Sequence, residues 1–351
     1  MLRTLIVAGA IVGILAAGCG PAPADKPTSE TPGGAGSKLR IVFVPKSAGN
    51  PYFAEVSKGL EKAAKELGAT VETQAPTTAD ATSQVTTIKD AVQRGCDLLV
   101  ISANAPDTLN DVLDEARKKG VTVVTVDSDI TGNETHRDAS VLPVDQEKVG
   151  PALVESLASL TGSEGEFAIL SAATDAPNQN KWIAGMKETL KNPKYSKLKL
   201  VDTVYGDDEM QKSTTEMEAL LTKYPNLRAV VSPTSVGMGA AAQVLETSGR
   251  YPGGPKANGT GIVLTGLATP NQLKKAVEKG VVTKFHLWSP AEMGEIAAHL
   301  GSMLHSKKVT ADVGKTFDVP GMGTKTFVDK GVVYVGPLTT FDKSNIANFD
   351  F

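Results

Sequence analysis

Short apolar runs alternate with amphipathic segments along the chain from Leu39 onward, and this alternation limits the folds open to it. Val121–Val126 shows the apolar type, with four valines, two threonines and no charged residue. Such a strand has no polar face, so helices must cover the sheet on both sides. Asn50-Pro51 begins one amphipathic segment with a capping side chain and a proline, and Gly68 ends it. These patterns predict an α/β protein with parallel sheets.

The alternation runs through the chain twice. Its first array is predicted to hold strands at 39–45, 69–75, 97–102 and 121–127, separated by helices at 51–67, 81–94 and 107–119. The second array begins after Val144, with strands at 166–171, 198–205, 228–232, 262–265 and 283–288 and helices at 179–190, at 210–224, from 236 and from 270. A helix at 290–304 and a Gly-rich, hairpin-like stretch at 313–335 follow.

Two arrays of similar size predict two Rossmann-like lobes, each built on a parallel central sheet and joined by a hinge. We expect the N-terminal lobe to comprise residues 39–143 plus about 290–312, and the C-terminal lobe to comprise 144–289 plus about 313–351. Parallel sheets bind ligands beyond the carboxyl ends of their strands. The expected site is therefore a cleft between the lobes.

The first residues resemble a bacterial lipoprotein signal. Arg3 precedes an uncharged apolar run to Gly18, which is shorter than the ~20 residues of a membrane-spanning helix and predicts an export signal over residues 1–18. Small residues then lead into Cys19, as in a lipobox, although Ala16 stands where a larger apolar residue is usual. The alternative is an ordinary secretory signal with Cys19 as a bystander. Residues 19–38 are rich in Pro, Gly, Ser and Thr and predict a flexible tether.

Charge and cysteine content exclude some classes of protein. The net charge of −3 gives no reason to expect a nucleic acid partner. Of the two cysteines, Cys19 is assigned to lipidation, which leaves Cys96 without a partner for an intrachain disulfide. Cys96 precedes an apolar strand, so we expect it to be a packed core residue rather than a reactive thiol.

Motifs for catalysis, cofactors and metals were not found in the sequence. The four histidines lack metal-ligand spacing, and there is no Cys-x-x-Cys, His-Glu-x-x-His or Gly-x-Ser-x-Gly. Gly237-x-Gly239 opens a helix, but Ala242 stands where a dinucleotide fingerprint has its third glycine. We therefore expect no enzyme activity, no cofactor and no metal. The carboxylates of Asp127 and Asp129 at a strand end could serve hydrolysis or accept hydrogen bonds from sugar hydroxyls, and the sequence leaves both open.

Eight short stretches, in order along the mature chain, carry a family resemblance. They are Val44-Pro45-Lys46, Asn50-Pro51-Tyr52-Phe53, Val100-Ile101-Ser102-Ala103-Asn104, Thr125-Val126-Asp127-Ser128-Asp129, Asn178-Gln179-Asn180-Lys181-Trp182, Ser232-Pro233-Thr234-Ser235, Ala268-Thr269-Pro270-Asn271 and Phe285-His286-Leu287-Trp288. Together with the ending Phe341–Phe351, they resemble the ribose-binding-type (type I) periplasmic binding proteins of ABC sugar importers. Within that family the chain looks most similar to the subgroup of rhamnose-binding proteins and furanosyl autoinducer receptors.

This resemblance implies ten ligand-binding residues, five for each lobe: Lys46, Asn50, Tyr52, Phe53 and Asp127, then Asn178, Gln179, Pro233, Ser235 and Trp288. Lysine, carboxylate and amide side chains suit sugar hydroxyls, and an aromatic ring suits the apolar face of a sugar. Several of them have a structural alternative: an exposed position for Lys46, core packing for Tyr52 or Phe53, or a capping role for Asp127 and Asn178. Trp182 and Trp288 could either flank the ligand or belong to the core.

The same resemblance bears on the ligand and on the role. The autoinducer receptor carries acidic residues where this chain has Asn178 and Ser289, whereas Leu287-Trp288-Ser289-Pro290 looks like the rhamnose-binding members. We therefore expect an exported, membrane-anchored, monomeric lipoprotein of the periplasm or cell surface that delivers a deoxyhexose such as rhamnose to an ABC permease. The alternatives are a receptor for the autoinducer or another pentose or hexose, and a signalling receptor subunit.

Overall fold

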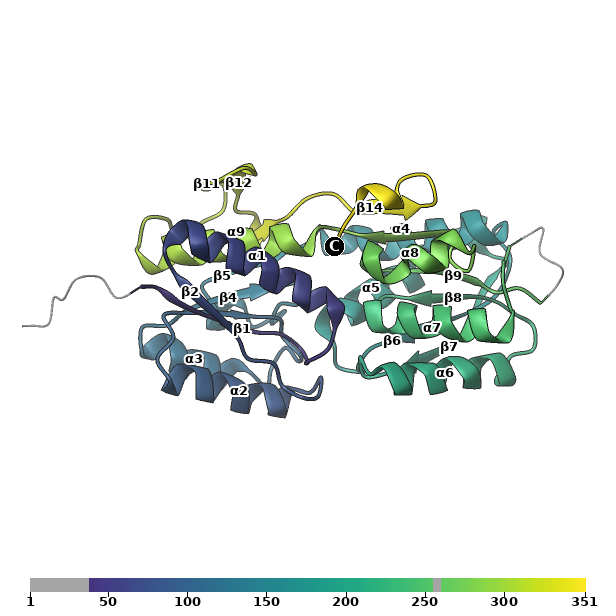
Figure 1. Cartoon of the computed structure of the whole chain (residues 1–351), viewed down its shortest axis with the longest axis horizontal. Coiled ribbons are helices and arrows are strands. Elements are labelled where there is room, and N and C mark those ends of the chain that lie inside the picture. Colours follow the sequence, from purple (N-terminus) through teal and green to yellow (C-terminus); the bar gives the residue numbers. More distant parts are fainter. Residues whose placement is uncertain (1–37, 255–259) are drawn as a thin grey trace, which may run out of the picture. The chain divides into compact units, whose positions relative to one another are not determined.

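The computed structural model describes residues 38–254 and 260–351. The expected signal at 1–18, Cys19 and the tether up to residue 37 lie outside the described residues. Residues Lys38–Phe351 form one compact unit built on two main sheets, one in each of two lobes (Figure 1). The predicted α/β fold with parallel sheets is confirmed.

A six-stranded sheet of parallel strands forms the centre of the N-terminal lobe, in the order β13-β5-β4-β3-β1-β2. Its strands are β1 (Arg40–Val44), β2 (Thr70–Thr73), β3 (Leu98–Ile101), β4 (Thr122–Val126), β5 (Ala139–Leu142) and β13 (Val332–Tyr334). Helices α1 (Pro51–Leu67) and α9 (Pro290–His305) cover one face, and α2 (Ala81–Gln93) and α3 (Asn110–Lys118) cover the other (Figure 1).

Both faces of this sheet are buried, which explains its apolar strands. Successive side chains of a strand point to opposite faces. In β1, Ile41 and Phe43 accordingly join the core beneath α1 and α9, while Val42 and Val44 join the core beneath α2 and α3. Cys96 is buried with the second group, and burial raises the pKa of its thiol to about 11. Its predicted role as a core residue is confirmed.

The C-terminal lobe contains a four-stranded parallel sheet in the order β7-β6-β8-β9. Its strands are β6 (Gly165–Ser171), β7 (Leu198–Tyr205), β8 (Leu227–Ser232) and β9 (Val263–Gly266), and its helices are α4 (Gln146–Thr161), α5 (Pro177–Thr189), α6 (Met210–Lys223), α7 (Ser235–Ser248) and α8 (Pro270–Glu278). A separate antiparallel pair, β10 (Lys284–Leu287) and β14 (Thr339–Asp342), adjoins it through a single bridge between Leu267 and His286.

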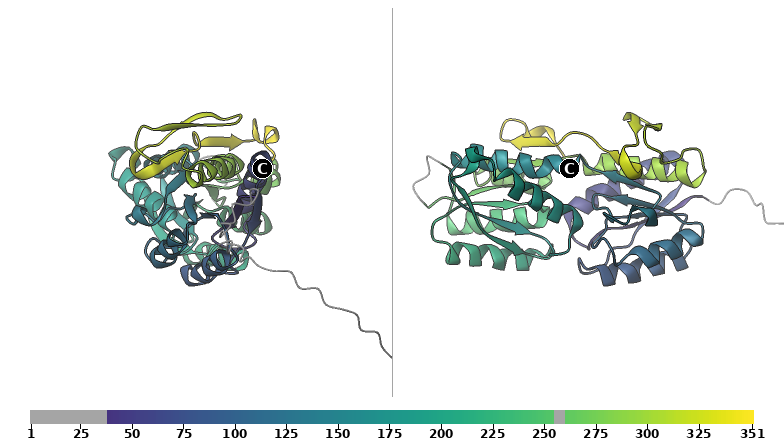
Figure 2. Two further views of the ribbon diagram at one scale, coloured as in Figure 1. Left: turned by 90° about the vertical axis from the view of Figure 1, so that its left-hand side faces the viewer. Right: turned by 180° about the vertical axis from the view of Figure 1, so that it is seen from behind.

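The chain passes between the lobes three times, at residues 143–145, 288–289 and 335–338. The first and third linkers run side by side, because Val335 N–H donates to Leu142 O (3.0 Å) and Gly336 N–H donates to Pro143 O (3.2 Å). Figures 1 and 2 show the last part of the chain, in yellow, running from the first lobe to the second.

The third crossing corrects the expected lobe boundaries. We expected residues from about 313 onward to belong to the C-terminal lobe, but β13 pairs in parallel with β5, Val332 with Ser140. Before β13, the strands β11 (Thr316–Val319) and β12 (Gly323–Thr326) form the predicted hairpin. The return to the C-terminal lobe therefore comes after Val335. Pairing with a distant strand decides this assignment, and local pattern does not report it.

Two elements at the first crossing escaped the sequence prediction, β5 and α4. Strand β5 has only four residues, and α4 contains Gly150 and Pro151, which are poor helix formers. Tertiary packing explains the glycine: a Cβ at Gly150 would lie 2.6 Å from both Met186 N and Trp182 O of α5. Close contact between α4 and α5 therefore takes precedence over helix propensity here.

Close helix packing also fixes the start of α9, just after the second linker. A Cβ at Gly59 in α1 would lie 1.9 Å from Ala291 O, and one at Gly294 would lie 2.2 Å from Val56 O. Only glycine allows the two backbones to approach this closely. Because Trp288 and Ser289 directly precede α9, this contact helps to set the position of the second linker.

Within the described ranges, no helix is long and apolar enough to cross a membrane.

Candidate ligand-binding site

A cavity lies between the two lobes, at the carboxyl ends of strands from both main sheets. It has about 350 Å³ of empty space between its walls, part of it open to solvent. Its walls are formed by Lys46, Asn50, Tyr52, Phe53, Asp127, Asn178, Gln179, Trp182, Asp208, Pro233, Thr234, Ser235, Leu267, Leu287 and Trp288. The structure thus brings all ten residues selected from the sequence to one cavity.

Asp127 lies directly after β4 and is almost fully buried. Its backbone adopts a left-handed conformation (φ 61°), which aspartate tolerates better than most residues. The carboxylate accepts hydrogen bonds from Ser102 Oγ (2.9 Å), Tyr52 Oη (3.1 Å) and Asn178 Nδ2 (3.3 Å). Burial raises the pKa of Asp127, while Lys46 and these donors oppose the rise. Three donors thus orient an acceptor toward the cavity.

Lys46 follows β1 and is also buried. Its ammonium donates to Asn178 Oδ1 across the cleft (2.8 Å). Burial lowers the pKa of Lys46, and the carboxylates of Asp127 and Asp208 oppose that shift. The exposed-lysine alternative is therefore wrong. The ammonium can therefore donate to a polar ligand while the nearby carboxylates compensate its charge.

A buried amide network holds the loops that carry these charges. Gln84 Nε2 donates to Ser102 O (2.7 Å) and Pro45 O (3.2 Å), and its oxygen accepts from Asn104 N–H (2.9 Å). Asn104 Nδ2 in turn donates to Lys46 O (2.9 Å). The carbonyls beyond β1 and β3 are satisfied in this way, so the position of Lys46 is determined within its own lobe.

Asn178 and Gln179 lie in the first turn of α5. Asn178 contacts both N-terminal charges and also accepts from Gln179 N–H (2.9 Å), so it combines a bridging role with part of the capping role considered for it. Gln179 Oε1 accepts from Ser171 Oγ and Ala172 N–H, both at 2.8 Å. These bonds fix the amide of Gln179 at the edge of the cavity.

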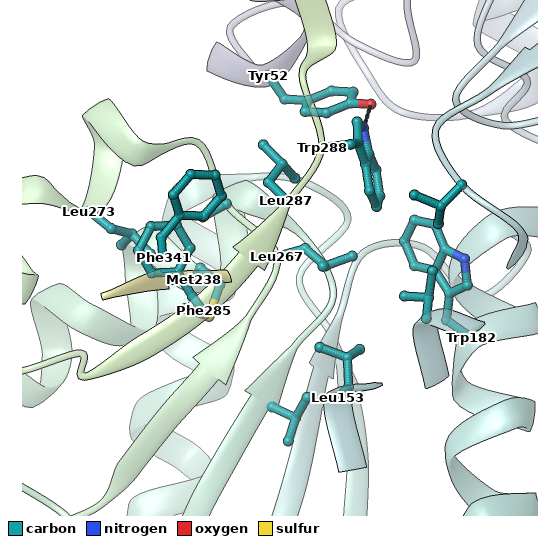
Figure 3. Close-up of a cluster of buried hydrophobic side chains, with 14 of the residues drawn as sticks. Tyr52, Leu153, Trp182, Met238, Leu267, Leu273, Phe285, Leu287, Trp288 and Phe341 are labelled. Carbon is teal, nitrogen blue, oxygen red and sulfur yellow. Dashed lines mark hydrogen bonds between the residues drawn. The ribbon is translucent and has the colours of Figure 1, made fainter. Parts of the chain in front are cut away.

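Aromatic side chains line another part of the cavity (Figure 3). Tyr52 Oη accepts from Trp288 Nε1 (2.7 Å), and the two rings meet edge to face with centroids 6.3 Å apart. Trp288 faces Trp182 at 5.8 Å, and Trp182 Nε1 donates to Gln146 Oε1 (2.6 Å). Both tryptophans are buried and also line the cavity, so core packing and a place in the site are combined rather than alternative. Phe53 packs against Tyr52 at 5.2 Å.

The remaining predicted residues lie at helix N-termini. Asn50 caps α1, because its Oδ1 accepts from Tyr52 N–H (3.0 Å). Pro233 follows β8, and Ser235 is the first residue of α7. Their loop brings the N-terminus of α7 to the cavity, where its N–H groups and dipole favour electron-rich ligand atoms.

Sequence reasoning missed Asp208, Thr234, Leu267 and Leu287. Thr234 and Leu287 stand within or beside stretches that had been singled out, so proximity could have found them. Asp208 belongs to no motif. Its only signal is its position three residues after the predicted strand 198–205.

The second carboxylate of the Asp127–Asp129 pair forms an ion pair with Arg137. Arg137 binds Asp129 with two hydrogen bonds (2.6 and 2.7 Å), both side chains are buried, and Asp129 does not line the cavity. Both carboxylates line a second cavity beside Arg137, but only Asp127 also lines the cavity between the lobes described above. Among residues 38–254 and 260–351, no group of three His, Cys, Asp or Glu side chains could hold a metal ion.

Comparison with known proteins places this geometry in a family. The model of the periplasmic binding protein domain matches residues 41–308. The ribose import binding protein of Bacillus subtilis (strain 168) is 24% identical over 272 residues, which cover 77% of this chain and 82% of the relative.

Two solved structures are similar over most of their length. An ABC transporter solute binding protein from Clostridium phytofermentas with bound L-rhamnose is 32% identical (TM-score 0.83; 90% of this chain, 98% of that chain). A sugar ABC transporter protein from Actinomyces odontolyticus is 37% identical (TM-score 0.68; 90% of this chain, 100% of that chain). The chain therefore belongs to the type I periplasmic binding proteins, the sugar-binding components of ABC importers.

Proposed function

We propose that this protein captures a 6-deoxyhexose such as rhamnose and delivers it to an ABC permease. The observation that carries the proposal is the cavity itself, which combines the polar side chains of Lys46, Asp127 and Asn178 with the aromatic side chains of Tyr52 and Trp288. A pyranose offers hydroxyls to the polar side chains and an apolar C–H face to the aromatic rings. The methyl group of a 6-deoxy sugar suits an aromatic wall better than a hydroxymethyl group does.

Two substitutions relative to the autoinducer receptor support this choice of ligand. Asn178 is an amide that already donates to one carboxylate and accepts from an ammonium, and Ser289 caps α9 through a bond to Glu292 N–H (3.2 Å). Neither position offers the acidic group that the receptor carries. The rhamnose bound in the Clostridium phytofermentas structure supports the same assignment.

Calorimetry with rhamnose, fucose, ribose, glucose and the furanosyl autoinducer tests the proposal. We expect rhamnose or fucose to bind most tightly, because a site built on hydrogen bonds rejects analogues that leave its polar groups unpaired. Tight autoinducer binding without sugar binding would instead assign the receptor role. Sugar binding by a chain that supports no uptake in cells would favour a signalling subunit.

The setting of this function is also proposed. We infer that the protein is exported, acts as a monomer in the periplasm or at the cell surface, and is held to the membrane by a lipid on Cys19. The lobes, 39–143 with 290–335 and 146–287 with 339–351, would open and close about the three linkers. No cofactor, metal or nucleic acid enters this proposal.

A further inference from the structure

Asp208 is the charged residue of the cavity that the family resemblance did not supply, and its backbone is unusual. It follows β7 and Gly206, and both Asp207 (φ 51°) and Asp208 (φ 53°) adopt left-handed conformations. A Cβ at Gly206 would lie 2.1 Å from Ser213 Oγ, so α6 packs tightly against this turn. Two successive left-handed aspartates cost free energy that the surrounding structure must offset, and such outliers concentrate at functional sites.

The turn points two neighbouring carboxylates in different directions. Asp207 forms an ion pair with Lys212 of α6 and does not line the cavity. Asp208 lines the cavity and accepts a hydrogen bond from the hydroxyl of Thr234, the residue that precedes α7. Thr234 thus orients the Asp208 carboxylate, while Asp207 is neutralised outside. The two residues form a natural matched pair for experiment.

The charges that line the cavity are unbalanced because of Asp208. Lys46 is the one ammonium among the lining residues, whereas Asp127 and Asp208 are two carboxylates. Burial raises the pKa of Asp208, and repulsion from the carboxylate of Asp127 raises it further. A ligand with its own carboxylate would be the third anion around one cation in a poorly solvated space. Like charges in such surroundings are strongly unfavourable.

We propose that Asp208 restricts the cavity to uncharged sugars and excludes sugar acids. This inference rests on the proposed sugar-binding function and adds its selectivity against anions. The carboxylate also accepts hydrogen bonds from hydroxyls, so it favours neutral polyols while repelling uronates. The C-terminal lobe thereby contributes to specificity by repelling anionic ligands, in addition to the attractive contacts of Asn178 and Gln179.

The test replaces the carboxylate and keeps the shape. Asp208→Asn retains an oxygen for the Thr234 hydroxyl and tolerates the left-handed backbone, and Asp208→Gly adopts that backbone without strain. Asp207→Asn makes the same change in charge one residue away and outside the cavity. Binding of galacturonate, glucuronate and mannuronate is measured beside the 6-deoxy sugars with the same ring configuration.

We expect the wild type to bind a neutral sugar and to bind hexuronates at least tenfold more weakly. Asp208→Asn and Asp208→Gly should each bind a hexuronate at least tenfold more tightly than the wild type does. Asp208→Asn should bind the neutral sugar less than tenfold more weakly, and Asp207→Asn should change neither.

Three results would overturn the inference. Wild-type protein that binds uronates as well as neutral sugars would remove it and leave sugar binding intact. The inference is also overturned if both Asp208 variants still bind neutral sugar but show no increase in affinity for uronates. It is overturned as well if Asp207→Asn increases uronate affinity as much as the Asp208 variants do. A wild type that binds no sugar in either set would overturn the proposed ligand class, and this inference with it.

Discussion

The two lobes repeat one architecture but hold their sheets together differently. In the N-terminal lobe six parallel strands form one continuous ladder. In the C-terminal lobe four strands do so, and β10 and β14 adjoin them through one bridge. His286 in β10 helps to hold this junction, since its ring bonds to Ser156 Oγ of α4 (2.5 Å) and Thr340 Oγ1 of β14 (3.0 Å). Backbone pairing therefore holds the whole sheet of the N-terminal lobe together, whereas side chains help to join the two sheets of the C-terminal lobe.

The two lobes each contribute one wall of the cavity, and these N-terminal and C-terminal walls also differ in how they are held. Asp127 is held by Ser102 and Tyr52 of its own lobe, whereas Asn178 makes two of its bonds to Lys46 and Asp127 of the opposite lobe. We conclude that the N-terminal wall is preorganised and that the C-terminal wall is completed when the lobes meet. Sugar affinity should depend most on the N-terminal wall, and closure of the lobes should depend most on the C-terminal wall.

Acid should destabilise the C-terminal lobe at the junction that His286 holds together. Burial lowers the pKa of His286 from 6.5 to about 4, with a contribution from Lys284. The unfolded chain takes up this proton below pH 6.5 while the native protein does not. The stabilisation is therefore complete above that pH and is lost as the pH falls toward 4, by about 3 kcal/mol for a shift of this size.

Urea unfolding of wild type and His286→Gln from neutral pH down to pH 4 measures this contribution. The free energy of unfolding should fall more steeply with acid in the wild type than in the variant, by roughly 3 kcal/mol over that interval. Parallel pH profiles for the two proteins would show that the junction between β10, α4 and β14 does not sense acid.

Removing the central acceptor tests the preorganised wall. Asp127→Ala leaves Lys46 beside one carboxylate fewer and leaves the hydroxyls of Ser102 and Tyr52 without their acceptor. Sugar binding should weaken by about 2–3 kcal/mol, or roughly 30- to 150-fold, as measured by calorimetry. Asp90→Ala, an exposed change on α2 of the same lobe, is the control. Unchanged affinity in Asp127→Ala would place the ligand elsewhere.

A smaller effect is expected from the closing residue. Asn178→Ala removes the acceptor for Lys46 and the donor to Asp127 across the cleft, which should disfavour the closed form by about 1–2 kcal/mol. Small-angle scattering without sugar should give a larger radius of gyration for the variant, and saturating sugar should reduce it. Asn180→Ala, on the same helix and bonded locally to Thr174 O, should behave as wild type. Equal radii for all three proteins would argue against Asn178 as a latch.

The proposed anchor should have no effect on either wall. Cys19→Ser is expected to move the protein from the membrane fraction to the soluble fraction while sugar affinity stays the same, because the residue precedes the folded unit. Fractionation and intact-mass measurement of the mature protein check this. A variant that remains in the membrane fraction, or a wild type without lipid mass, would exclude the anchor.

The location of the cavity followed from the sequence because polar residues after strand ends are a local signal. Asp127 directly follows an apolar strand, Lys46 lies two residues after another, and parallel strands bring their carboxyl ends to one edge. Asp208 follows a strand as well, but it stands beside Asp207 and Glu209 in what reads as a solvated acidic run. Only the left-handed turn and the hydroxyl of Thr234 separate its direction from that of Asp207.

By itself, the sequence determined the fold class, the helix boundaries at Asn50 and Gly68, and the burial of Cys96. These depend on the period of apolar residues and on local backbone chemistry. The tertiary structure decided that β13 joins β5, that Asp129 pairs with Arg137, and that Asn178 spans the cleft. Each of these is a contact between residues whose partners are chosen by packing of the whole chain, which no local pattern encodes.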